Sequence, residues 1–148
     1  VRLLLNPAPA RKVPDSLLSK IDIITPNESE CEIITGLPAS CVEDAGKVVG
    51  FFRHKGVSQV VVTMGEKGVV YNRGEEIVHR QAYKVKAVDT TAAGDSFSGA
   101  LAVALSRGDS IDEAVDFASA VGALTVTRMG AQPSLPYMDD IKKFKGGL

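Results

Sequence analysis

The sequence predicts a layered αβα fold with a mostly parallel central sheet, because strand-like apolar runs alternate with helical patterns along the chain. The run at 59–63 is rich in β-branched residues, which is typical of a strand buried in a parallel sheet. With 148 residues, 45% of them hydrophobic, the chain is long enough for one domain with its own core. We see no repeat or linker that would divide residues 1–148.

The expected elements follow one another along the whole sequence. In chain order they are a strand at 1–5, a short helix at 15–20, a strand at 21–25, helices at 27–35 and 42–55, a strand at 59–63, a hairpin of 69–72 with 75–79, and helices at 95–107, 112–128 and 136–144.

Proline and glycine mark the ends of the early elements. The strands at 1–5 and 21–25 are each stopped by a proline-containing turn. Asn27 and Glu30 have the spacing of a capping box, so a helix is expected to begin there and to end at Gly36.

The middle of the chain has further boundaries of the same kind. Gly56 closes the helix at 42–55, and the β-branched run at 59–63 follows it. The next two strands form a hairpin around Arg73-Gly74, where glycine permits a tight turn. In the helix after residue 94, four apolar residues fall on one face: Phe97, Leu101, Ala104 and Leu105.

Residues 89–97 (Asp-Thr-Thr-Ala-Ala-Gly-Asp-Ser-Phe) are the most informative stretch for function. The small residues Ala92, Ala93 and Gly94 leave backbone N–H groups accessible at a helix N-terminus, where anions such as phosphate bind. Asp95 beside them is a candidate general base for an attacking hydroxyl group. An anion-binding helix N-terminus next to a general base indicates phosphoryl transfer. An acid in the first turn also stabilises a helix by itself, so Asp95 alone is a weak signal.

Other polar residues allow both a structural and a functional interpretation. Asp89, expected at the end of a strand, is either a turn residue or a ligand of a hard cation. Asn27 and Glu30 either cap their helix or contact a ligand at the carboxyl end of a strand. The segment 63–68 is either a plain glycine turn or a close approach to a nucleotide.

Several classes of function are disfavoured by the sequence. There is no P-loop and no dinucleotide fingerprint, and His54 and His79 lack the spacing of metal ligands. The net charge of -1 and the scattered basic residues give no nucleic-acid footprint, and no apolar run is long enough for a membrane span. Cys31 and Cys41 form no C-x-x-C pair, which favours a reduced intracellular protein.

A serine hydrolase is an alternative, because Gly94-Asp95-Ser96 is similar to a hydrolase motif. Such a site needs a histidine base held by an acid, and no histidine follows His79. A nucleotide-binding module without catalysis is a second alternative.

The segments together resemble the ribokinase-like (PfkB) family of carbohydrate kinases. Residues 89–97 are similar to the family's C-terminal signature, D-T-x-x-A-G-D-x-F. Further segments match the family in the same order: 6–10, 25–30, 62–65 and 130–134. The resemblance implies ATP-dependent phosphorylation of a sugar hydroxyl, with D-ribose phosphorylated at its 5-position as the expected substrate.

The resemblance also implies roles for single residues. Asp95 is similar to the catalytic base, and Ala92, Ala93 and Gly94 to the anion hole. Contacts with ATP are implied for Asn27, Glu30, Thr63, Gly65, Gly68, Gly94 and Ser119, and Glu30 is also similar to the acid that orders Mg²⁺ through water. A site for a monovalent cation, K⁺ in this family, is implied at Asp89, Thr91, Thr125, Arg128, Gly130 and Ser134.

The sequence departs from the family in two ways. Family members are about twice as long, so residues 1–148 correspond to the C-terminal, nucleotide-binding half of one domain, without the N-terminal half and lid. We expect this half alone to be nearly inactive, and the full enzyme to be a cytoplasmic homodimer that binds a sugar and ATP. Ser119 stands where relatives often have a larger polar residue near adenine.

Overall fold

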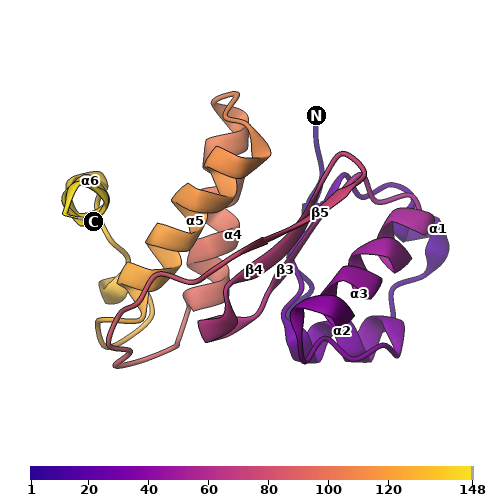
Figure 1. Ribbon diagram of the computed structural model, residues 1–148, viewed down its shortest axis with the longest axis horizontal. Coiled ribbons are helices and arrows are strands. Elements are labelled where there is room, and N and C mark those ends of the chain that lie inside the picture. The colour runs from indigo at the N-terminus through magenta and orange to yellow at the C-terminus, as the bar shows by residue number, and fades with distance from the viewer. Residues whose placement is uncertain (148) are drawn as a thin grey trace. The chain divides into compact units, whose positions relative to one another are not determined.

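The computed structural model describes residues 1–147, and the chain divides into two compact units, Val1–Gln81 and Ala82–Leu148 (Figure 1). The first unit contains the sheet, and the second consists of helices and loops.

The first unit is built on one five-stranded sheet with the strand order β1-β2-β3-β4-β5. The strands are β1 (Leu4–Leu5), β2 (Ile23–Ile24), β3 (Gln59–Thr63), β4 (Val69–Arg73) and β5 (Glu76–Arg80). β1, β2 and β3 run parallel, whereas β4 and β5 are joined to β3 as an antiparallel hairpin. The α/β class is therefore confirmed, with the parallel strands gathered at one side of the sheet.

The helices of the first unit follow the parallel strands. They are α1 (Asp15–Leu18), α2 (Glu28–Thr35), α3 (Val42–His54) and the 3₁₀ turn η1 (Gly65–Lys67). α3 lies along β3 and β4 (Figure 1), and Val48, Val49 and Phe52 of this helix are buried in the same core as Val60 and Val62 of β3. Burial of such side chains stabilises the unit by roughly 1.5–3 kcal/mol for each large one.

Element boundaries in this unit agree with local chemistry. β3 has the expected bounds, and Gly36 ends α2 with a φ of 74°, a left-handed conformation that suits glycine. The strands β1 and β2 are shorter than predicted, because only two residue pairs join them in register. The hairpin turns at Gly74-Glu75 instead of Arg73-Gly74, because Arg73 pairs with Glu76 and Gly74 takes the positive φ of 59°.

The second unit pairs two long helices. They are α4 (Ala93–Ser106) and α5 (Ile111–Thr125), followed by the 3₁₀ turn η2 (Gln132–Ser134) and α6 (Met138–Gly146). Small buried residues such as Ala104, Ala114 and Ala118 let α4 and α5 pack closely. α5 starts with a capping box of Ser110 and Glu113.

The prediction of a strand ending at Asp89 is wrong, because the structure has no strand there. Residues 81–89 carry no strand pairing; instead the N–H groups of Val88 and Asp89 donate to the carbonyl of Val126 at 2.7 and 3.1 Å. The end of α5 thus supplies the acceptor that a neighbouring strand would have supplied. Among residues 1–147, no helix combines the length and the apolar character needed to cross a membrane.

Candidate active site

The start of α4 is formed by an alanine in an unusual conformation. Ala92, the N-cap, has φ 61° and ψ 10°. Among residues 1–147 it is the only residue other than glycine that has a positive φ. This left-handed conformation costs a residue with a Cβ atom about 1–2 kcal/mol, and such strain is concentrated at functional sites. An alanine side chain also has no atom that can cap the helix.

The first turn of α4 therefore presents backbone donors. The Ala93 N–H donates to Thr90 at 3.2 Å and the Ser96 N–H to Ala92 at 2.9 Å. Gly94 lies between them at a position for which the helix itself supplies no acceptor, and Gly94 and Asp95 are both exposed. An accessible helix N-terminus with small residues can bind an anion.

Asp95 lies in this first turn with its residue exposed to solvent. An acidic residue in the first turn interacts favourably with the positive end of the helix dipole. Asp95 and the small residues Ala92, Ala93 and Gly94 thus lie together at the start of α4 in the second unit, and their roles stay predictions.

Asp89 joins this loop to a segment far away in the sequence. Its Oδ1 accepts the Thr91 N–H at 2.9 Å, and its Oδ2 accepts the Gly130 N–H at 2.8 Å. Hydrogen bonds from the side chain of Thr91, the N–H of Gly130 and the N–H of Thr91 lower the pKa of the Asp89 carboxyl group. The carboxylate thus holds two loops together.

The remaining residues of the expected cation site, Thr125, Arg128 and Ser134, lie in or next to the 126–134 segment. The hydroxyl groups of Thr125 and Ser134 donate to the carbonyls of Val121 and Ala131, at 2.9 and 2.6 Å. The guanidinium group of Arg128 pairs with Asp140 of α6 at 3.3 Å. Asp89, Thr91 and Gly130 are brought together by direct hydrogen bonds, and the cation site itself stays a prediction.

Within residues 1–147, no group of three or more His, Cys, Asp or Glu side chains is arranged to hold a metal ion. Asp89 is the one acidic side chain in the set that the resemblance implies for the monovalent cation. A Mg²⁺ ion would depend on substrate phosphates and water, which is its usual habit.

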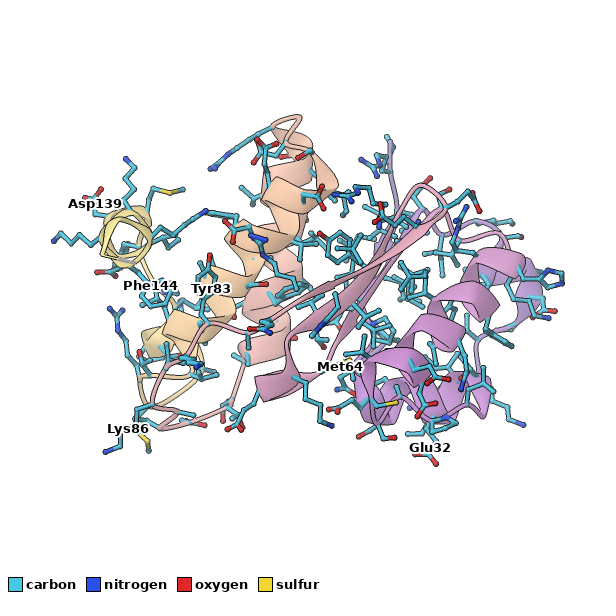
Figure 2. The ribbon with its side chains drawn as sticks, viewed as in Figure 1. Glu32, Met64, Tyr83, Lys86, Asp139 and Phe144 are labelled. Carbon is cyan, nitrogen blue, oxygen red and sulfur yellow. The ribbon has the colours of Figure 1, made fainter. Side chains whose placement is uncertain are left out.

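A second cluster of predicted residues lies in the first unit, at the carboxyl ends of β2 and β3. Asn27 and Thr63 form a parallel β-bridge, and the Thr63 N–H donates to Pro26 at 3.0 Å. The turn after Thr63 begins at the buried Met64, which Figure 2 labels near α2. Gly65 and Gly68 in this turn have φ values of 56° and 95°, which favour glycine.

Asn27 and Glu30 form the expected capping box of α2. Asn27 Oδ1 accepts the Glu30 N–H at 2.9 Å, and Glu30 Oε2 accepts the Asn27 N–H at 2.8 Å. The structural interpretation of this pair is therefore correct, and the box engages one carboxylate oxygen of Glu30. The sequence did not single out Lys67, which bonds to the first residue of α2; its position in the glycine turn was the available signal.

Two serines have different surroundings. The Ser119 hydroxyl on α5 is buried and has no hydrogen-bond partner within residues 1–147, so its contact with adenine stays a prediction. Ser96 is buried as well, and its hydroxyl donates to Ala93 at 2.9 Å. A hydrolase nucleophile must be accessible to its substrate and to a base, so this geometry disfavours the hydrolase alternative.

The fold and these sites define an α/β protein with a helix N-terminus suited to anions beside an exposed carboxylate. Residues 1–138 match the model of the pfkB family of carbohydrate kinases, and the chain belongs to this family.

The similar proteins include kinases with different sugars in their names. The chain is 44% identical to a ribokinase of Haemophilus influenzae over 144 residues, which cover 97% of this chain and 47% of the relative. It is 36% identical to a deoxyribokinase of Salmonella typhi over 145 residues, with 97% and 47% covered. The chain thus spans about half the length of the curated relatives it matches.

Solved structures show the same relationship. The Arabidopsis thaliana ribokinase complexed with ribose and ATP matches with a TM-score of 0.90 at 36% identity, covering 97% of this chain and 47% of that one. An Escherichia coli relative in complex with ATP and Mg²⁺ matches with a TM-score of 0.77 at 32% identity, covering 90% and 42%.

Proposed function

We propose that the intact protein transfers the γ-phosphoryl group of ATP to a sugar hydroxyl, and that the sugar is D-ribose, phosphorylated at its 5-position. The observation that carries this proposal is the start of α4, where an alanine at φ 61° opens a helix N-terminus beside the exposed Asp95. The names of the similar proteins support a sugar kinase, and the Arabidopsis relative was solved with ribose and ATP.

In this proposal Asp95 accepts the proton of the attacking hydroxyl group. Ala92, Ala93 and Gly94, at the N-terminus of α4, form the anion hole that stabilises the charge developing on the transferring phosphoryl group. The hydroxyl oxygen attacks phosphorus in line with the departing ADP oxygen, and no covalent enzyme intermediate forms. Positioning and electrostatics supply the rate enhancement, because the chemistry requires little else from the protein.

The nucleotide would be bound by the residues for which the family resemblance implies contacts with ATP. Thr63, Gly65 and Gly68 would line it through the glycine turn, and Asn27 at the start of α2 would contact it. Gly94 and Ser119 complete the proposed set. The positive φ values of the two turn glycines support the assignment of the turn.

Two ions belong to the proposal. Glu30 would hold Mg²⁺ through water, which fits because the capping box uses only one carboxylate oxygen, Oε2. The ion neutralises phosphate charge when it is bound. K⁺ would be held by oxygens of Asp89, Thr91, Thr125, Arg128, Gly130 and Ser134, and the bond from Gly130 to Asp89 supports a shared site.

The assembly and the compartment are further parts of the proposal. Both Cys31 and Cys41 are free thiols, which supports a reducing compartment such as the cytoplasm. We also propose a homodimer, on the resemblance to the family alone.

The proposal is tested by Asp95→Asn in the intact protein. We expect kcat to fall by about 10²–10⁴-fold, because general base catalysis is lost, while affinity for ATP stays near the wild-type value. Asp139→Asn is the matched control, since Asp139 is also an exposed acid in the first turn of a helix, α6 (Figure 2). Near-normal turnover of Asp95→Asn would refute the role of the base.

Non-catalytic nucleotide binding remains the alternative outcome. Binding of ATP by the intact wild-type protein without phosphorylation of any sugar would favour it.

A further inference from the structure

Lys67 fastens the glycine turn after β3 to two other segments of the first unit. Its ammonium group donates to the carboxylate of Glu28 at 2.9 Å and to the carbonyl of Ser40 at 2.8 Å. Glu28 is the first residue of α2, and Ser40 lies in the connection from α2 to α3. One side chain therefore ties the turn to the helix whose N-cap is Asn27.

The main chain of Lys67 is bound as well. The Nε2 atom of His79, on β5, lies 2.7 Å from the Lys67 carbonyl oxygen. Because a carbonyl oxygen only accepts hydrogen bonds, the histidine nitrogen is the donor. The residue is thus bound from α2, from the α2–α3 connection and from β5.

The contacts of Lys67 contribute little to the free energy of unfolding of the whole protein. The side chains of Lys67 and Glu28 are 53% and 38% exposed, and exposed ion pairs contribute little to the stability of a fold. The turn itself contains glycines at positive φ on either side of Glu66-Lys67, and glycine leaves the backbone with many accessible conformations. The local geometry of the turn is what the contacts of Lys67 restrict.

Direct binding of phosphate by Lys67 is also disfavoured. Two of the three ammonium donors are engaged, and the charge is paired with a carboxylate. Lys67 is better placed to act through the segments that it joins.

We propose that Lys67 is a positioning residue, which holds the Thr63–Gly68 turn in a fixed relation to the start of α2 through Glu28 and Ser40. Its effect on ATP rests on the proposed function, because both joined segments are proposed to contact the nucleotide. Residues on either side of a nucleotide must keep a common geometry to bind it well, and a loss of that geometry lowers affinity.

Kinetics of the intact protein give the first test. We expect Lys67→Met and Glu28→Ala each to raise the KM for ATP, by up to roughly fivefold, while kcat and the KM for the sugar stay unchanged. The double variant should be no worse than Lys67→Met, since both changes remove the same link. Lys67→Arg should restore most of the affinity.

A second ion pair of the same unit provides matched controls. Lys47 pairs with Glu43, an acid in the first turn of α3, at 3.2 Å. Lys47→Met and Glu43→Ala remove a comparable exposed pair and should leave every kinetic constant unchanged.

Hydrogen exchange gives a test that does not depend on ATP. Amides of residues 64–68 should exchange faster in Lys67→Met and in Glu28→Ala than in the wild type and the two controls. Unchanged exchange would overturn the proposal, as would a higher KM in Lys67→Met with a normal KM in Glu28→Ala, which would mean direct contact with ATP. If the wild type fails to use ATP, the proposed function is refuted and the exchange rates alone decide the role of Lys67.

Discussion

The helices α2 and α4 begin in opposite ways. At α2, the side chains of Asn27 and Glu30 satisfy backbone donors through a reciprocal box, with bonds of 2.8 and 2.9 Å. At α4, the N-cap is Ala92 in a left-handed conformation, with no polar side chain to do the same. A chain that caps α2 and α5 with side chains has left the N-terminus of α4 without such a cap.

The difference indicates that a ligand is expected to provide the hydrogen-bond acceptors at the start of α4, where the N-cap side chain provides none. Unpaired N–H groups at a helix terminus carry a partial positive charge, and an anion satisfies them as well as a side chain does. The strained φ of Ala92 and the exposure of Gly94 and Asp95 point to the same end of the same helix.

The largest effect is expected when α4 receives a carboxylate at its N-cap. Ala92→Asp places a negative charge beside the proposed anion hole, where it repels phosphate and competes for the backbone donors. We expect kcat/KM for ATP to fall by about 10²-fold, while the protein remains folded. Ser110→Asp, at the N-cap of α5, is the control and should keep full activity. Equal activity of Ala92→Asp and the wild type would contradict an anion hole at α4.

A smaller effect is expected when the cap of α2 is removed. Asn27→Ala should lower the free energy of unfolding by about 1 kcal/mol, because Glu30 loses its capping partner. Denaturant unfolding measures this loss, and Ser110→Ala should produce a similar one at α5. Only Asn27→Ala should also raise the KM for ATP; if both variants raise it equally, Asn27 has no specific contact with the nucleotide.

The smallest effect concerns the pH dependence of stability. The pKa of Asp89 is lowered from 3.8 by hydrogen bonds from Thr91 and Gly130, so its folded-state pKa lies below that of the unfolded chain. The stabilisation is fully present above about pH 4–5 and is lost as the pH falls through the folded-state pKa. In thermal unfolding from pH 6 to pH 3, Tm of the wild type should therefore fall more steeply than Tm of Asp89→Asn. Parallel curves would show that the carboxylate contributes nothing to this dependence.

Local chemistry was sufficient to predict much of the first unit. The β-branched run at 59–63, the box of Asn27 and Glu30, and the stop at Gly36 each depend on neighbours within a few residues. The α/β class and the family followed from such segments and from the pattern around Asp95, and both are confirmed.

Features that depend on distant residues were not predictable in the same way. Nothing in an alanine indicates a positive φ, so the conformation of Ala92 is imposed by its surroundings. The strand expected before Asp89 failed because the partner of that segment is the carbonyl of Val126, at the end of α5. The link between Lys67 and Glu28 joins residues 39 positions apart, and the glycine turn around Lys67 gives no indication of which residue Lys67 contacts.

The bond from Gly130 to Asp89 has a consequence for shortened chains. It crosses 41 positions of sequence, so the nine-residue signature is supported by a segment that lies outside it. A protein truncated after α5 would retain every letter of that signature and still lose a support of its loop. The nine signature residues alone are therefore an incomplete criterion of activity. For a shortened protein, the presence of the segment around Gly130 should be checked as well.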